Sequence, residues 1–263
     1  MAERLSSLEF DFLWESAGIG ELPYPLQVRS HGETMEERAT LRQQVLAELA
    51  RRGIVDESGR PQPHIEDLLG VVAGSDVSLD SVQISAPSAE PQLAVVAALG
   101  SQGTMLIRDP QGFFLDRVPS DGLASAIVGL LPPAPRGKEK SITVPLEQLL
   151  SGPGVDFMQR RAPSPDGGRA SVDEDRKALA RLHAQPRLRG GQIGANARSR
   201  TGSKSRMPVL SWFDTETGRY FTQATRGRDG RDWITIAPAD AATLRHRLSE
   251  MLAGAANSTA APL

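Results

Sequence analysis

The acidic side chains best placed to do chemistry lie in the stretch Trp212 to Gly218, which reads WFDTETG. Asp214 and Glu216 have the spacing at which two carboxylates on a strand can hold the Mg²⁺ ions of a phosphodiester-hydrolysing site. A two-metal site needs further carboxylate ligands, and only 45 residues follow Gly218 to supply them. Because Gly218 also predicts a tight turn, we interpret this stretch as a solvated turn rather than a metal site.

Other kinds of catalytic or cofactor chemistry have little support in the residue types. The chain has no cysteine, which excludes disulfides, thiolate catalysis and cysteine-bound zinc. Its histidines are scattered and form no pair at metal-ligand spacing. The glycine-rich run Arg189 to Gly194 precedes a predicted strand, whereas a phosphate-binding loop leads into a helix. We therefore predict no metal and no cofactor.

Residues 176–206 form a basic segment that contains no acidic residue. Its bases are Arg176, Lys177, Arg181, Arg187, Arg189, Arg198, Arg200, Lys204 and Arg206. Such a segment can be a solvated face, a surface that recognises an acidic protein, or a nucleic-acid-binding surface. No aromatic residue interrupts it, which argues against stacking on single-stranded bases. Nucleic-acid binding through residues 176–206 stays as the alternative function.

The composition is that of an ordinary globular protein. The chain has 263 residues and a formal net charge of −2, which does not indicate a dedicated nucleic-acid binder. No apolar run approaches the roughly 20 residues that cross a bilayer. The first residues, MAERLSSLEFDF, carry acids where a secretory signal has an apolar core. We expect a cytoplasmic protein without membrane contact, either a monomer or a weak homodimer.

The segment Pro208 to Leu252 predicts three short strands followed by a helix. Apolar and polar residues alternate along Val209 to Asp214, the period of a pleated strand. Pro238 occupies the place of a helix N1 proline, with Asp240 in the first turn. Leu244, Leu248, Met251 and Leu252 recur at helical spacing and mark the buried side of that helix.

The same plan occurs earlier in the chain, at Gly103 to Leu131. This stretch predicts a strand, a tight turn, a second strand and a helix, joined by Val118-Pro119-Ser120-Asp121, which aligns with Ala237-Pro238-Ala239-Asp240. The repeated plan indicates an internal duplication. We expect an N-terminal half at residues 1–132, a Pro-rich linker at 133–140, a C-terminal half at 141–254 and a disordered tail at 255–263, with a mobile loop at 151–171.

The remaining pattern fills in both halves. Helices are predicted at Leu8–Ala17, Thr34–Arg52, His64–Ala73, Ser120–Leu131, Pro145–Leu150 and Val172–Ala184. Strands are predicted at Val77–Ser85, Leu93–Leu99, Thr104–Arg108, Phe113–Val118, Ser141–Val144 and Gly191–Ser199. Each half thus contains helices, about four antiparallel strands and a closing helix, an α+β protein.

Several of these stretches together resemble the EspG family, the chaperones of ESX (type VII) secretion. Near the N-terminus the resemblance rests on Glu9-Phe10-Asp11, Leu13-Trp14-Glu15, Gly20 to Leu26, Ser30 to Thr34, Glu37-Arg38 and Leu49 to Gly53. Near the C-terminus it rests on Gly191 to Ala195, Trp212 to Thr215, Gly218-Arg219-Tyr220 and Trp233 to Asp240. The segment Val77 to Ser171 is much less diagnostic.

The resemblance implies a fold and a function. Proteins of this family have a central antiparallel β-sheet flanked by two helical bundles with pseudo-twofold symmetry. They are cytosolic and not enzymes, and they bind a heterodimer of a Pro-Glu and a Pro-Pro-Glu protein at the helical tip of the latter. The sheet and the C-terminal helical bundle form the binding surface. By strand parity, we expect the partner-binding residues to be Gln192, Asn196, Arg198, Trp212, Arg219 and Tyr220.

Overall fold

The structure, a computed structural model, describes residues 2–86, 88–146, 177–182, 184–227 and 230–260. The predicted loop at 151–171, almost all of the predicted helix Pro145–Leu150 and the first part of the helix predicted at Val172–Ala184 lie outside these residues. Residues 177–182 of that last helix are helical.

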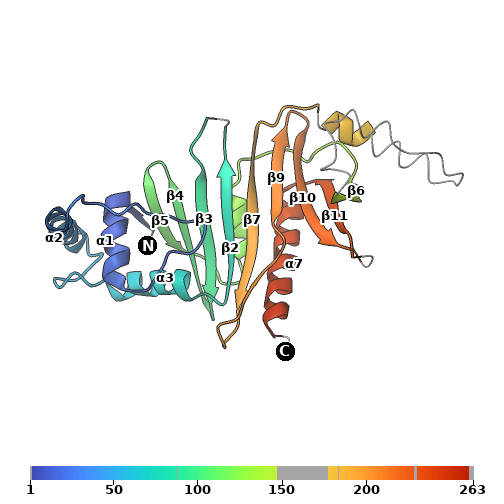
Figure 1. Cartoon of the computed structure of the whole chain (residues 1–263). Helices are drawn as coiled ribbons and strands as arrows, with labels where there is room; N and C mark the ends of the chain where they lie inside the picture. Colours follow the sequence, from blue (N-terminus) through green and yellow to red (C-terminus); the bar gives the residue numbers. More distant parts are fainter. Residues whose placement is uncertain (1, 87, 147–176, 183, 228–229, 261–263) are drawn as a thin grey trace, which may run out of the picture.

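One antiparallel sheet forms the centre of the molecule (Figure 1). Its strands are β1 (Glu3–Leu5), β2 (Val77–Ile84), β3 (Gln92–Leu99), β4 (Gln102–Asp109), β5 (Gly112–Arg117), β6 (Ile142–Pro145), β7 (Arg189–Arg198), β8 (Lys204–Arg206), β9 (Leu210–Thr215), β10 (Gly218–Arg226) and β11 (Asp232–Pro238). The helices are α1 (Ser7–Ala17), α2 (Met35–Arg51), α3 (Pro63–Gly74), α4 (Leu123–Gly129) and α7 (Ala241–Ala260). The predicted α+β class and antiparallel sheet are confirmed.

The order of the strands is symmetric about the pair β2 and β7. From one edge to the other it runs β1-β5-β4-β3-β2-β7-β9-β10-β11-β6, and β8 pairs with β7 beside β9. On each side of the centre, four strands follow one another in chain order, and one short strand forms the edge. The hairpins β4–β5 and β10–β11, each followed by a closing helix, occupy equivalent places. This is the pseudo-twofold arrangement that the repeated plan predicts.

Helices cover the two faces of the sheet differently. On one face, here called the α3 face, α1 and α3 bury Val95, Leu106 and Leu115 in the N-terminal half, and α2 packs against α1. Residues 177–182 cover part of the same face in the C-terminal half, where Leu182 packs with Phe213, Tyr220 and Ile236. On the opposite face, the α7 face, α4 and α7 pack together against β2, β3 and β7, and Figure 1 shows α7 running behind the strands.

Local sequence signals explain where most helices begin. Ser6 caps α1 through a reciprocal capping box with Glu9, and Thr34 caps α2 by accepting from the backbone N–H of Glu37. Pro63 occupies the first turn of α3. These helices lie within two residues of the positions predicted from the sequence.

The predicted starts of the closing helices are wrong. Pro238 ends β11, and α7 begins only at Ala241. Asp240 caps α7, because its carboxylate accepts from the backbone N–H of Thr243 at 2.7 Å. Likewise α4 begins at Leu123, after Gly122. The Pro-x-Asp pattern therefore lies at the end of a strand, and the helix begins after the Asp.

Two further boundaries differ from those predicted. The predicted disordered tail begins at residue 255, but α7 continues to Ala260. The Pro-rich linker at 133–140 runs along β10 instead of standing free: Gly137 N–H donates to Arg219 O at 3.0 Å, and Lys138 and Glu139 N–H donate to the Tyr220 hydroxyl at 3.0 and 3.1 Å. Composition predicts where a connection lies, but the contacts of its backbone depend on the neighbouring strand.

Candidate partner-binding groove

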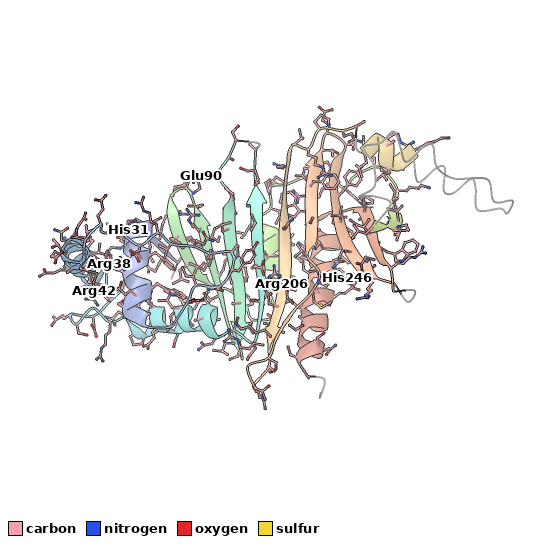
Figure 2. All side chains as sticks on the ribbon, in the orientation of Figure 1. His31, Arg38, Arg42, Glu90, Arg206 and His246 are labelled. Atoms are coloured by element: carbon pink, nitrogen blue, oxygen red, sulfur yellow. The ribbon has the colours of Figure 1, made fainter. Side chains whose placement is uncertain are left out.

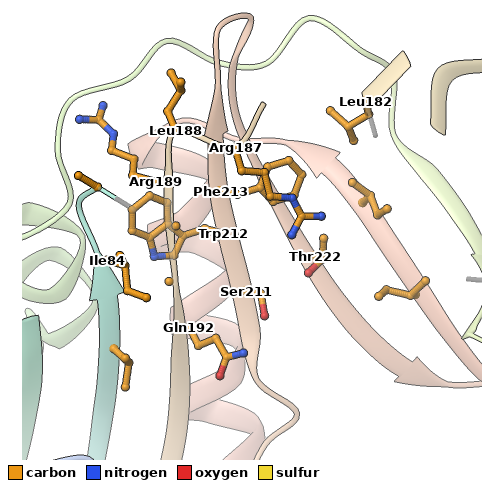
Figure 3. A pocket seen from close by; sticks show the side chains of 16 residues that line it. Ile84, Leu182, Arg187, Leu188, Arg189, Gln192, Ser211, Trp212, Phe213 and Thr222 are labelled. Atoms are coloured by element: carbon orange, nitrogen blue, oxygen red, sulfur yellow. The ribbon is translucent and has the colours of Figure 1, made fainter. Parts of the chain in front are cut away.

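A groove of about 720 Å³ lies on the α3 face, over the C-terminal half of the sheet. Its floor crosses five neighbouring strands: β2, β7, β9, β10 and β11. Side chains alternate between the faces of a sheet, so the register places Gln192 beside Val82, Ser211 beside Gln192 and Thr222 beside Ser211 on the same face. Leu182 of the covering helical turn forms one wall (Figure 3).

The lining of the groove is mostly apolar. Val82, Ile234 and Ile236 lie along it, and Ile84 and Leu188 stand at its open end with 42% and 46% of their surfaces exposed. Ile84 and Leu188 are two of the few large apolar residues that the described part of the chain leaves exposed. A surface that combines an apolar floor with exposed aliphatic residues is typical of a protein-binding site.

Two arginines are the charged residues among the described lining. Arg189 is neutralised, because its Nε donates to Asp214 Oδ2 at 2.6 Å. Arg187 is exposed, and its guanidinium lies 4.6 Å from the centre of the Phe213 ring (Figure 3). None of the described lining residues is acidic, so the groove carries a positive charge at the end beside Leu182 and Leu188.

Trp212 reaches the groove from the other face of the sheet. Its side chain is 2% exposed and packs in the core beneath α4 and α7, but it also lines the groove beside Gly191. A Cβ at Gly191 would lie 2.8 Å from Trp212 Nε1 and 2.5 Å from Val82 O, so only glycine fits between these strands. Trp212 Nε1 is buried and has no hydrogen-bond partner within the described residues.

The partner-binding residues that the sequence predicts do not all lie at one site in the structure. Gln192 and Trp212 line the groove. Asn196 and Arg198 lie further along β7, where Arg198 lines a separate hollow beside the end of α7. Arg219 and Tyr220 are both buried: Arg219 pairs with Asp214 on the α7 face, and Tyr220 packs with Leu182 and Phe213 on the α3 face, beside the groove.

Asn196 belongs to a polar cluster near the centre of the α3 face. The buried Asp80 carboxylate accepts from Asn196 Nδ2 at 2.7 Å and from Arg206 Nη2 at 2.9 Å. Hydrogen bonds from Arg206 to Asp80 raise the pKa of the Arg206 guanidinium, despite the opposing effect of burial. Arg206, labelled in Figure 2, also lies 5.4 Å from the ring of Tyr24, which is highly exposed. This cluster joins Tyr24, in the loop between α1 and α2, to β2, β7 and β8.

The interpretation of Asp214 to Gly218 as a solvated turn is wrong for its first residues. Asp214 and Thr215 are buried. Both carboxylate oxygens of Asp214 accept hydrogen bonds from arginines, Oδ1 from Arg219 and Oδ2 from Arg189 and Arg219. Within the described residues, no three His, Asp or Glu side chains come together as a metal site would require. Asp214 therefore organises an ion-pair cluster.

The basic segment 176–206 is partly neutralised by acids from elsewhere in the chain. Arg181 pairs with Glu139, Arg189 with Asp214, and Arg206 with Asp80. Each of these pairs removes a cation from the surface that would release counterions from a nucleic acid. The geometry therefore gives no specific support to nucleic-acid binding.

The sequence patterns did not indicate several of the groove residues. Arg187 was one cation among many in the basic segment, and Leu188 was a single apolar residue inside it. Ile84 ends β2, more than a hundred positions earlier in the chain. Leu188, a single aliphatic residue beside the Pro186-Arg187 step, could have suggested an exposed contact, but only the pairing of β2 with β7 brings Ile84 near it.

None of the described helices has the length and apolar composition needed to cross a membrane.

The family model described as the EspG family matches residues 6–250. No curated protein matches the chain. Among solved structures, the chain is similar to the Mycobacterium tuberculosis type VII secretion system chaperone EspG5 in complex with the PE25–PPE41 dimer, with 15% identity and a TM-score of 0.68. That similarity covers 96% of each chain and concerns the fold.

Proposed function

The chain belongs to the EspG family, and we propose that it is a cytosolic, non-catalytic chaperone of type VII (ESX) secretion. In this proposal it binds a Pro-Pro-Glu protein, in its heterodimer with a Pro-Glu protein, at the helical tip. The similar EspG5 structure is a complex with such a dimer, PE25–PPE41. Bound in this way, the pair stays soluble and competent for secretion.

The apolar groove across β2, β7, β9, β10 and β11 is the single observation that carries the proposal. Five strands spaced about 4.8 Å apart give a floor roughly 20 Å wide. Two packed helices, each about 10 Å in diameter with axes 8–10 Å apart, occupy roughly that width. The floor therefore fits the tip of a helical hairpin, and its exposed aliphatic residues match the apolar surface that such a tip must hide.

The physical role follows from these properties. An exposed apolar tip promotes aggregation, and a preformed sheet face covers it without itself having to fold. We expect a few apolar anchors to supply most of the affinity, surrounded by polar contacts that exclude water. Within this proposal, Gln192 and Trp212 contact or border the tip, Asn196 and Arg198 lie at its margin, and Arg219 and Tyr220 hold the floor in shape.

Co-expression with the Pro-Glu/Pro-Pro-Glu pairs encoded beside the gene tests the proposal. The expected result is that a pair becomes soluble only in the presence of this chain and co-purifies with it. Leu188→Asp and Ile84→Asp should each weaken binding at least tenfold, because a carboxylate in the apolar contact must give up its hydration and replaces an aliphatic anchor. Both side chains are already exposed, so the fold should be unaffected.

Leu99→Asp provides a matched control. Leu99 is 39% exposed, comparable with Ile84 and Leu188, but it lies at the end of β3 that leads into β4, outside the groove. It should leave binding unchanged. If no pair binds the wild-type chain, or if Leu99→Asp is as harmful as the groove variants, the proposed function of this surface is wrong.

A further inference from the structure

Arg187 differs from four arginines that form ion pairs around the C-terminal half of the sheet. Arg181, Arg189, Arg206 and Arg219 each pair with a carboxylate of the chain. Arg187 instead lies over the ring of Phe213, 4.6 Å from its centre, and no acid among the described residues pairs with it. Its positive charge is therefore available to a molecule that enters the groove.

The backbone around Arg187 is held in place on both sides. Gln185 N–H donates to Leu182 O, and the Gln185 side chain accepts from the Thr217 hydroxyl at 2.6 Å. On the other side, Leu188 N–H donates to Asp214 O at 2.9 Å. Stacking on Phe213 further orients the guanidinium. A charge that is preorganised in this way loses little conformational entropy when it binds.

The groove also constrains what can occupy it. A helical tip that covers the floor removes water from Arg187, and an arginine desolvated without an anion strongly disfavours binding. Because the described lining offers no carboxylate to compensate, the occupant must supply one. A guanidinium matches a carboxylate through two parallel hydrogen bonds, which depend on its position and orientation.

We infer that Arg187 is a specificity-determining residue that binds an Asp or Glu carboxylate on the helical tip of the partner. This inference rests on the proposed function. The carboxylate pairs with the outer edge of the guanidinium, while the apolar residues beside it on the tip contact Leu188 and Ile84. Partner proteins with a neutral or basic residue at that place are rejected, because Arg187 would then be buried without a counter-charge.

Charge reversal on both sides of the interface tests the inference. In binding measurements with the heterodimer that co-purifies with the wild-type chain, Arg187→Glu should weaken binding at least tenfold. Reversing the Asp and Glu residues of the partner's tip to Lys, one at a time, should identify one variant that binds Arg187→Glu better than it binds wild type. Arg187→Lys should retain part of the affinity, because it keeps the charge but loses the planar stack.

Arg226→Glu is the matched control, since it reverses an exposed arginine at the end of β10 that lies outside the groove. It should leave the affinity within about twofold, and the salt dependence of binding should decrease in Arg187→Gln but not in Arg226→Gln. If Arg187→Glu binds as wild type while Leu188→Asp does not, the inference is wrong and the proposed function stands. If no reversed tip restores binding to Arg187→Glu, the pairing with a carboxylate is likewise refuted. If wild type binds no heterodimer, the proposed function itself fails.

Discussion

Arg219 and Asp214 form a bidentate ion pair in the interior of the C-terminal half. Arg219 Nε donates to Asp214 Oδ1 at 2.7 Å and Arg219 Nη2 donates to Oδ2 at 2.8 Å, with both side chains buried. Arg219 also lies 4.6 Å from the Trp212 ring and donates to Pro132 O at 2.7 Å. This one guanidinium thus connects β9, β10 and the chain segment between the halves beneath the groove.

Arg219→Met should lower the free energy of unfolding by about 1–3 kcal/mol, because the buried Asp214 carboxylate loses two hydrogen bonds and keeps only Arg189 as a counter-charge. Urea denaturation followed by tryptophan fluorescence measures this loss. Arg198→Met, at an exposed position, should cost less than about 0.5 kcal/mol. If Arg219→Met loses less than about 1 kcal/mol, the attraction between Arg219 and Asp214 barely exceeds the free-energy cost of removing their charges from water.

Tyr220→Phe should destabilise the protein by about 1–3 kcal/mol, since the Tyr220 hydroxyl accepts the backbone N–H groups of Lys138 and Glu139. Hydrogen exchange at these two amides should become faster. Tyr24→Phe removes a hydroxyl from a highly exposed ring and should change stability by less than about 0.5 kcal/mol. Unchanged exchange at residues 138 and 139 would contradict the anchoring of this segment on β10.

Gly137→Ala tests the same contact from the other side. A Cβ at this position would lie 2.3 Å from the Tyr220 ring, and the ring cannot retreat because it is packed against Phe213 at a centroid distance of 5.7 Å. We expect a loss of about 1–3 kcal/mol in urea denaturation. Gly129→Ala, at a helical glycine with no atom within 4 Å of the added Cβ, should be neutral or stabilising.

Asp11 should make stability depend on acid pH. Burial raises the pKa of Asp11, but hydrogen bonds from Arg38 and from His31 outweigh it, so the pKa lies below its ordinary value. For a lowered pKa, the stabilisation is complete above the unfolded-state value of about 3.9 and is lost as the pH falls through the folded-state value. Asp11→Asn should therefore lower the melting temperature at pH 7, and the difference from wild type should shrink below about pH 4.

The comparison for Asp11 is Asp67→Asn, because Asp67 is a half-exposed acid whose nearest arginine atom is 3.8 Å away. Asp67→Asn should change the melting temperature only slightly at every pH. A difference between Asp11→Asn and wild type that is constant from pH 7 to pH 3 would show that the carboxylate charge is not what stabilises the joint between α1 and α2.

Arg206→Met should cost about 1–3 kcal/mol, because the buried Asp80 carboxylate then keeps only the neutral Asn196 amide as a side-chain donor. Lys204→Met is the control, as an exposed cation of the same short strand, β8. Equal stability of the two variants in urea denaturation would show that the Asp80–Arg206 pair is energetically neutral.

Much of the fold could be predicted because its signals are local. The alternation of Val209 to Asp214 predicts a strand, observed at Leu210–Thr215, and Ser6 with Glu9 predicts the start of a helix, since each signal depends on residues close together in the chain. At Pro238 two local signals compete, one for a helix start and one for a strand, and strand pairing prevails: Pro238 lies opposite Tyr220 in the ladder. The family resemblance indicates which surface binds the partner, but not which side chains of that surface are free.

Residues close together in the chain are enough to specify the α+β class, the two similar halves and the family, because periodicity, caps and motifs are properties of neighbouring residues. Which charges are paired depends instead on the folded chain. Arg206 meets Asp80 across 126 positions and Arg189 meets Asp214 across 25, and such pairings depend on strand register. Of the similar cations in one basic segment, several are neutralised by distant carboxylates, and Arg187 is left above an aromatic ring at the end of an apolar groove.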